Sequence, residues 1–479
     1  MSTITIAWIA LPFFLGFVIY LLPKLDRCLA LCMALASAGY GLQLFITQSP
    51  LTLQLLDNFG VTLVIDQLSG YFILTNALVT AAVILYCWRT DKTAFFYTQT
   101  IILHGSVNAV FVCADFISLY VALEVISIAA FLLIAYPRTD RSIWVGLRYM
   151  FVSNVAMLFY LIGAVLVYQA HHSFSFADLR VAPPEAIALI FVGLLTKGGI
   201  FVSGLWLPLT HSESETPVSA MLSGVVVKAG VYPLVRCALM MEEVDPIVRI
   251  FGVGTALMGV FYAVFEKDTK RMLAFSTISQ LGWILAAPAV GGFYALTHGL
   301  VKSALFLIAG ALPSRNFKEL QHQPIATPIW IALVIASFSI SGFPLLSGFG
   351  AKVLTTNNLL PWQAIAMNIA ALGTAISFAK FIFLPRGGKA DVSPGFWAAM
   401  SLLIGGLILA NFVYYEAYTV ENIIKPLATI GLGWLAYLLI FKHSVLRLPR
   451  VLEQFEHLIG VMSLILILLF WKGFAWLGI

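Results

Sequence analysis

Long apolar runs follow one another along almost the whole chain, with only short polar segments between them. A helix of about 20 apolar residues crosses the hydrocarbon core of a bilayer, so each run is a candidate transmembrane helix. Only 10% of the residues are charged, against about 25% in soluble globular proteins, which excludes a soluble fold. The expected spans lie near residues 4–22, 28–47, 66–88, 94–113, 116–136, 145–169, 184–208, 217–241, 248–265, 272–289, 292–312, 326–357, 362–384, 394–413, 424–441 and 456–477. The sequence therefore predicts an all-α integral membrane protein, a single polytopic bundle of about 14 to 16 transmembrane helices.

Several classes of partner and cofactor are disfavoured by the same pattern. The net charge of +5 comes from Lys and Arg residues scattered among short loops, so the sequence offers no basic stripe for nucleic acid. The five cysteines lie mostly inside apolar runs without CxxC spacing, which argues against a disulfide framework or an iron–sulfur cluster. Because the chain also lacks a GxGxxG fingerprint and a nucleotide loop, we expect no cofactor of its own, and the pattern identifies no metal ligands.

Basic residues are concentrated in alternate loops. The loops after odd-numbered expected spans carry clusters such as Arg138 with Arg141 and Lys267 with Lys270, and the loops after even-numbered spans carry few. The expected loop 211–215 is the exception, since it has no Lys or Arg. Cytoplasmic loops retain basic residues, so both chain ends are predicted to lie outside the cytoplasm. We expect the inner (plasma) membrane of a prokaryote, with a thylakoid membrane as the alternative.

Six ionisable side chains lie deep within expected spans, where a charge costs at least about 2.5 to 3.5 kcal/mol. They are Glu124 in the fifth span, Lys197 in the seventh, Lys228 in the eighth, His298 and Lys302 in the eleventh and Lys352 in the twelfth. Each needs a partner or a water-filled cavity, so these six are the candidate residues for translocating protons. Lys197 and Lys228 are about 15 Å from either end of their spans, which is beyond the reach of a side chain.

Structural roles are the competing explanation for other polar residues in the spans. A lysine near a helix end can snorkel to the interface, and we expect this of Lys380. A hydrogen bond to a neighbouring helix is the alternative for His298. His104 and Asn108 lie one helical turn apart and are expected to be structural contacts between helices.

Two expected spans contain helix-breaking residues. The seventh has Gly198 and Gly199 beside its lysine, and the twelfth has Gly342 and Pro344 before its own. Unwound backbone at membrane depth is tolerated only where it lines a cavity, and paired interruptions in two halves are typical of inverted-repeat transporters. The sequence therefore predicts broken helices and an inverted repeat.

A series of motifs between about residues 60 and 390 carries a family resemblance. In chain order they are Trp206-Leu-Pro, Glu215-Thr-Pro-Val-Ser-Ala, Val227-Lys-Ala-Gly-Val-Tyr, Lys267-Asp-Thr-Lys-Arg-Met-Leu-Ala, His298-Gly-Leu-Val-Lys-Ser-Ala and Phe343-Pro-Leu-Leu-Ser-Gly-Phe-Gly-Ala-Lys. In this order they resemble the proton-translocating antiporter-like subunits shared by respiratory complex I, membrane-bound hydrogenases and Mrp multisubunit Na+/H+ antiporters. The lysine at position 352 makes the D-type Mrp subunits the most similar branch.

The resemblance implies a role for each buried charge. Glu124 matches the family's fifth-helix glutamate, and Lys197 matches its partner on the broken seventh helix. Lys228 matches the eighth-helix lysine, Lys302 the central lysine, and Lys352 the residue from which protons leave. While Glu124 and Lys197 are paired the lysine keeps its proton, and when the pair opens a proton passes along the lysines.

The resemblance also implies how the chain is divided. Two inverted five-helix repeats form half-channels at residues 94–241 and 242–390, between N-terminal helices at 1–93 and C-terminal helices at 391–479. The implied function is that of a proton-translocating channel subunit in a multisubunit Na+/H+ antiporter, with other subunits and membrane lipid as partners. The alternatives are a proton-pumping subunit of complex I or of a membrane-bound hydrogenase, a membrane subunit of an inorganic-carbon uptake complex, and a scaffold subunit that transports nothing.

Overall fold

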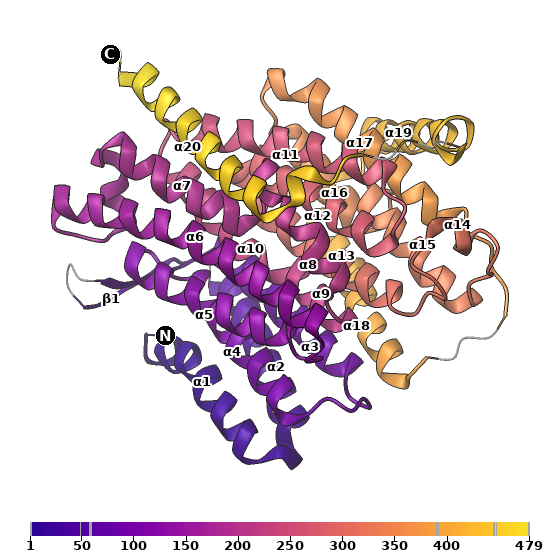
Figure 1. Cartoon of the computed structure of the whole chain (residues 1–479), viewed down its shortest axis with the longest axis horizontal. Coiled ribbons are helices and arrows are strands. Elements are labelled where there is room, and N and C mark those ends of the chain that lie inside the picture. The colour runs from indigo at the N-terminus through magenta and orange to yellow at the C-terminus, as the bar shows by residue number, and fades with distance from the viewer. Residues whose placement is uncertain are drawn as a thin grey trace.

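Helices packed side by side make up nearly all of the structure, a computed structural model that describes residues 2–47, 49–56, 60–388, 392–443, 446 and 448–477 (Figure 1). Within these residues, 12 helical segments are long and apolar enough to cross a membrane. Each of the sixteen segments expected from the sequence contains helix, including four that are too short or too polar to meet that criterion alone. The prediction of a polytopic all-α membrane protein is confirmed.

Three breaks interrupt transmembrane helices within the described residues: at 199–206, at 222–226 and at 342–346. Before the first interruption come α1 (Ser2–Leu21), α2 (Asp26–Thr47), α3 (Gln67–Tyr86), α4 (Ala94–Val110), α5 (Phe116–Ile134) and α6 (Asp140–His171). The next group is α7 (Pro184–Gly198), a 3-10 turn (Phe201–Trp206), α8 (Leu207–Glu213), α9 (Thr216–Met221), a π-helical turn (Leu222–Val226) and α10 (Lys228–Met240). There follow α11 (Asp245–Phe265), α12 (Thr269–Ala286), α13 (Gly291–Ala309), α14 (Phe317–Leu320), α15 (Thr327–Ser341), α16 (Ser347–Asn357), α17 (Ala364–Ile382), α18 (Pro394–Asn411), α19 (Val420–Leu439) and α20 (Phe455–Leu477).

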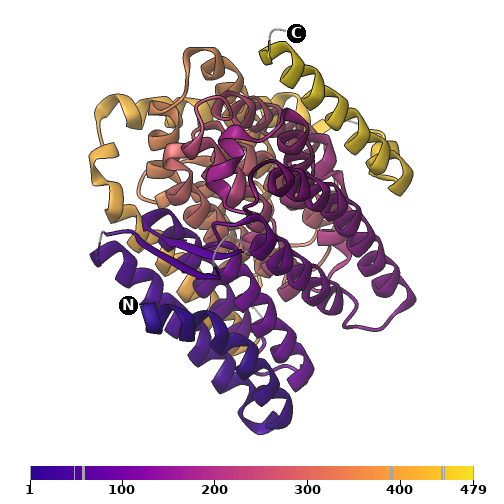
Figure 2. The same cartoon turned by 90° about the vertical axis from the view of Figure 1, so that its left-hand side faces the viewer.

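Two central helices have no exposed side. Every residue of α12 and α13 is buried, and α13 packs against α3, α9, α12, α15, α16 and α18. Many large apolar side chains of α1 and α19 are exposed instead, as expected of helices that face lipid. The C-terminal α20 runs along the outer side of α6 and α7 (Figures 1 and 2). A polar side chain on α13 is therefore shielded from lipid by a complete layer of protein.

A short hairpin that the sequence analysis did not predict lies between α2 and α3. Its strands, β1 (Leu51–Leu56) and β2 (Gly60–Ile65), are antiparallel. The backbone N–H of Val64 donates to the carbonyl of Val112, and that of Ala114 donates to the carbonyl of Thr62. These bonds attach the hairpin to the linker between α4 and α5.

Two of the helix interruptions have the same backbone geometry. α7 ends at Gly199, which has a φ of 69°, and Phe201 just beyond it has a φ of 53°. α15 ends at Gly342, which has a φ of 86°, and Leu345 beyond it has a φ of 80°. A left-handed glycine closes each helix, and a second left-handed residue then redirects the chain. The prediction of broken helices is confirmed at both places.

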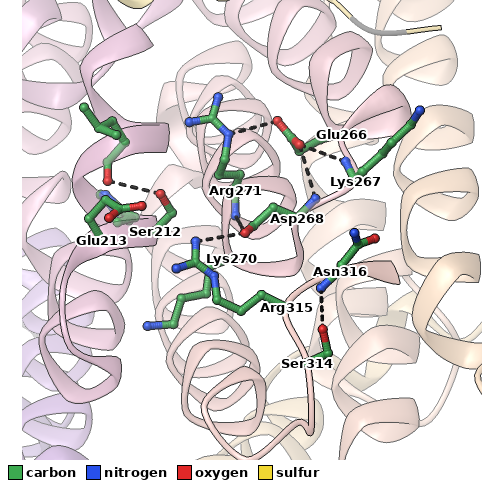
Figure 3. Close-up of polar contacts among 12 residues, drawn as sticks. Ser212, Glu213, Glu266, Lys267, Asp268, Lys270, Arg271, Ser314, Arg315 and Asn316 are labelled. Carbon is green, nitrogen blue, oxygen red and sulfur yellow. Dashed lines mark hydrogen bonds and ion pairs between the residues drawn. The ribbon is translucent and has the colours of Figure 1, made fainter. Parts of the chain in front are cut away.

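An ion-pair network joins the start of α12 to the C-terminal segment. Figure 3 shows the part of it around Arg271 and Glu266. Arg271 donates to Glu266 at 3.0 Å and to Glu453 at 2.6 Å. Arg148 on α6 donates to the backbone carbonyl of Glu453. Glu453 therefore bridges α6 and α12. Burial alone would raise the pKa of Glu266, but the Arg271 guanidinium and two backbone N–H groups outweigh it and hold that pKa below its ordinary value.

Replacing Glu266 by Gln is expected to destabilise the protein at neutral pH by about 1.5 to 3 kcal/mol, the range for a hydrogen bond to a charged group. Because the folded-state pKa is depressed, the stabilisation is present above the unfolded pKa and is lost as the pH falls below about 4. Thermal unfolding in detergent at pH 7 and pH 4 measures the difference. Glu421→Gln, in an exposed pair with Lys425, is the matched control and should change nothing. Equal effects of Glu266→Gln and Glu421→Gln would contradict the stabilising role assigned to the Glu266 carboxylate.

Replacing Gly199 by Ala is expected to lower the melting temperature of the purified protein. An alanine in the left-handed region is strained by about 1 to 2 kcal/mol, and its Cβ would lie 2.2 Å from Cδ1 of Leu207. Gly39→Ala is the control, because Gly39 lies in α2 and a Cβ added there meets no atom within 4 Å. An unchanged melting temperature in the Gly199 variant would show that the break does not depend on this glycine.

Candidate functional site

The ammonium of Lys197 is held by neutral oxygens of two other helices. Lys197 lies in the last turn of α7 and is 4% exposed. Its Nζ donates to the carbonyl of Leu123 at 3.1 Å and to the hydroxyls of Ser127 on α5 and Ser153 on α6, each at 2.5 Å. An ammonium has three donors, so these contacts satisfy it completely.

Glu124 lies next to this lysine but is not bonded to it. It is half-buried in the middle of α5, and its Oε1 is buried without a hydrogen-bond partner. Among the described residues no ion pair within 4.0 Å joins Glu124 to Lys197, although the two interact electrostatically. The expected carboxylate–ammonium pair is therefore open in this structure.

Lys228 is the first residue of α10 and follows a helix interruption that the sequence analysis did not anticipate. The interruption is the π-helical turn Leu222–Val226, and the Nζ of Lys228 donates to the carbonyls of Gly224 and Ser223 in this turn. Turns of this kind are frequent at functional sites because they free carbonyl groups from the regular helical pattern. Lys228 is 0% exposed and is solvated by backbone alone among the described residues.

The enclosed α13 carries Lys302 and His298. The Nζ of Lys302 donates to the carbonyl of Leu273 on α12 at 3.0 Å and lies 5.3 Å from the ring centre of Phe378. Neither ring nitrogen of His298 has a hydrogen-bond partner among the described residues. His298 lines a cavity of about 10 Å³ together with Gln280, Tyr294, Thr297, Val301, Ser339, Ile340 and Gly348. This is about the room that one water needs.

Lys352 lies on α16, directly beyond the break after α15. Its buried Nζ has no hydrogen-bond partner among the described residues and lies 5.3 Å from the ring centre of Trp283. The hydroxyls of Ser339, Ser347 and Thr355, on the helices either side of the break, are also buried and unpartnered. Buried polar groups without protein partners mark places for ordered water.

The structure brings four of the six predicted residues into one row. A Cβ added to Gly299, the residue after His298, would lie 3.6 Å from the Nζ of Lys228. Both Lys228 and Lys302 act electrostatically on His298. Tyr294, which lines the cavity beside His298, stacks on Trp283, and the ring of Trp283 lies 5.3 Å from the Nζ of Lys352. Lys197 and Glu124 form a separate group, although α7 and α10 touch where Gly198 faces Gly230.

Sequence analysis did not anticipate the burial of His211, and the structure shows the partners of Lys380. His211 was expected in a loop, but α8 extends to Glu213, and the ring of His211 is fully buried 5.8 Å from that of Phe306 on α13. Lys380 was expected to snorkel to the interface from near its helix end, and its ammonium does lie at a helix end. Its buried Nζ donates to the carbonyls of Ala263 and Glu266 at the end of α11, at 2.9 and 2.8 Å.

The structural role predicted for His104 and Asn108 is confirmed. Nε2 of His104 lies 2.8 Å from the hydroxyl of Ser37 on α2, and Nδ1 lies 3.2 Å from that of Thr80 on α3. Asn108 accepts from Asn76 at 2.8 Å. Elsewhere in the described part of the chain, no cluster of three or more His, Cys, Asp or Glu side chains could hold a metal ion.

Comparisons with known proteins agree with this arrangement. Residues 113–377 match the family described as NADH:quinone oxidoreductase/Mrp antiporter, TM. The chain is 31% identical over 429 residues to the N-type subunit of NADH-quinone oxidoreductase of Desulforudis audaxviator, covering 78% of this chain and 85% of that one. It is 26% identical over 431 residues to the D-type subunit of the Na(+)/H(+) antiporter of Alkalihalophilus pseudofirmus, covering 80% and 87%.

Two solved structures share the fold. A chain of the membrane-bound sulfane sulfur reductase, an archaeal respiratory membrane complex, gives a TM-score of 0.77 at 21% identity and covers 91% of this chain and 99% of its own. A chain of the Mrp complex from Dietzia sp. DQ12-45-1b gives 0.73 at 19% identity, with 95% and 98% covered. The chain therefore belongs to the NADH:quinone oxidoreductase/Mrp antiporter family of transmembrane proteins.

Proposed function

We propose that this chain is the proton-translocating channel subunit of a multisubunit Na+/H+ antiporter. The observation that carries the proposal is the row of Lys228, His298, Lys302 and Lys352 through the enclosed centre of the bundle. Lys228 and Lys302 are 0% exposed, and no described carboxylate pairs with either. An ammonium so placed is expensive to keep charged, and a lysine can exchange a proton near neutral pH only under such conditions.

The geometry supports a stepwise path for the proton. Opening of the contact between Glu124 and Lys197 releases a proton toward Lys228, which interacts electrostatically with both His298 and Lys302. Ordered water in the small cavity beside His298 and at the unpartnered hydroxyls near the α15–α16 break carries it on to Lys352. Moving one charge across 100 mV is worth about 2.3 kcal/mol, so the steps must be gated to prevent a leak.

The two matching helix breaks support an inverted repeat. We assign the half-channels to residues 94–241 and 242–390, with 1–93 and 391–479 as flanking helices. The boundary at residue 94 is the start of α4, and the boundary at 241 follows the end of α10. The boundary at 390 lies outside the described residues. Loop charges favour both chain ends outside the cytoplasm. The proposed location is a prokaryotic plasma membrane, where the chain assembles with other antiporter subunits.

A complex I-type proton pump is the second candidate. It is favoured by the likeness to the N-type subunit of NADH-quinone oxidoreductase, which is higher in identity than the likeness to the D-type antiporter subunit. In that case electron transfer takes place in partner subunits, and the same buried row moves protons.

Replacing Lys228 or Glu124 by Ala is expected to reduce Na+-driven proton exchange to the background of the host vesicles. Each substitution removes a group that the proposed path requires. Exchange is measured as Na+-induced collapse of a pH gradient in inverted vesicles that contain the assembled complex. Lys24→Ala, at an exposed lysine of the α1–α2 linker, is the control and should retain exchange. Normal exchange in either site variant, with normal assembly, would rule out this path.

Purification from the native membrane in a mild detergent tests the assembly. We expect the chain to copurify with small hydrophobic antiporter subunits and without flavin or iron–sulfur absorbance. Mass spectrometry identifies the accompanying proteins, and a visible spectrum detects the chromophores. Copurification with a quinone-reducing iron–sulfur enzyme would favour the second candidate instead.

A further inference from the structure

The three oxygens around Lys197 form a compact polar cluster at the junction of α5, α6 and α7. The hydroxyls of Ser127 and Ser153 lie 2.9 Å apart, and Ser127 also donates to the carbonyl of Leu123 at 2.9 Å. Both serines are buried. We call the hydroxyls of Ser127 and Ser153 with the carbonyl of Leu123 the neutral seat.

We infer that the neutral seat is a second binding position for the Lys197 amine, in competition with Glu124, and that Ser127 and Ser153 are positioning residues for proton release. This inference rests on the proposed function. Two observations carry it independently: the ammonium is fully satisfied at the seat, and the carboxylate beside it has a buried oxygen left unpartnered.

The neutral seat and Glu124 differ in the hydrogen bonds that they can form with the Lys197 amine. A carboxylate only accepts hydrogen bonds, so it stabilises the charged amine and disfavours loss of the proton. A serine hydroxyl both accepts and donates, so it binds an ammonium as acceptor and a neutral amine as donor. Because Ser127 already donates its proton to the Leu123 carbonyl, the hydroxyl of Ser153 is the group that can donate to a neutral amine. The neutral seat therefore accommodates Lys197 in either protonation state, whereas the negative charge of Glu124 favours the charged state.

Few other titratable groups face the amine. From α6, the ring of Tyr149 lies 6.0 Å from Nζ, and from α5 the facing group is Glu124. α10 presents the backbone of Gly230 to α7, and its Lys228 bonds instead to the π-helical turn. α20 also packs on α7, with Glu456 and His457 on its exposed side.

Replacing Ser127 and Ser153 by Ala, singly and together, tests the inference. Without the hydroxyls the amine returns to Glu124 and its charged form is stabilised, so proton release requires more alkaline conditions. We expect the pH of half-maximal Na+/H+ exchange to rise by about one to three units in the double variant, the size of the shift that an adjacent opposite charge produces. Ser→Thr at either position keeps the hydroxyl and should restore the wild-type profile.

Two further variants make the outcome decisive. Ser106→Ala is the matched control, since this buried α4 serine donates to the carbonyl of Ile102 in its own helix, as Ser127 does in α5. If Lys197→Ala retains exchange, the proposed function itself fails. If Lys197→Ala abolishes exchange but the double serine variant keeps the wild-type profile, only the neutral seat is wrong.

Infrared spectroscopy of the purified complex gives a readout that does not depend on transport. The Glu124 carboxyl band, identified by its loss in Glu124→Gln, should shift in Ser127→Ala and Ser153→Ala as the ammonium moves onto the carboxylate. An unchanged band in both variants would overturn the inference even if their exchange were impaired.

Discussion

Solvation of buried cations by backbone carbonyls is the interaction on which this structure depends. Four buried lysines each donate to a carbonyl oxygen of a neighbouring turn or helix: Lys197, Lys228, Lys302 and Lys380. In most helices those carbonyls are already bonded, so a cation can use them only at an interruption, at a helix end or as an additional partner. The helix breaks are therefore part of the electrostatics of the site as well as of its topology.

Neutral solvation has a consequence for chemistry. A buried ammonium paired with a carboxylate is locked in its charged form, and breaking such a pair is strongly unfavourable. Carbonyls and hydroxyls stabilise the charged form of the amine less than a carboxylate does, so losing the proton costs less free energy. The absence of a carboxylate partner for Lys228 and Lys302 among the described residues fits a path for protons better than a static structural ion pair.

Charged pairs are found instead near the ends of helices, and the largest network is at the start of α12. Arg271, Glu266 and Glu453 join α12 to the C-terminal segment, and Arg148 brings α6 to the same point. Because α6 also carries Ser153 and α12 carries the Leu273 carbonyl that binds Lys302, this network anchors helices from both lysine groups. The enclosed α12 and α13 can thus remain rigid while polar side chains between them exchange partners.

The sequence by itself determined the class of fold, the positions of the spans and six of the ionisable residues that lie deep within them. These follow from local properties: apolar length decides what crosses a bilayer, and a charge in a long apolar run has no alternative to burial. The breaks at Gly199 and Gly342 were predictable for the same reason, because glycine and proline act on their own backbone. What only the tertiary structure decided is which oxygen each cation meets. The seat of Lys197, the burial of His211 and the capping of α11 by Lys380 all join residues far apart in the chain, and hydrogen-bond partners across helices are set by packing that no local pattern encodes.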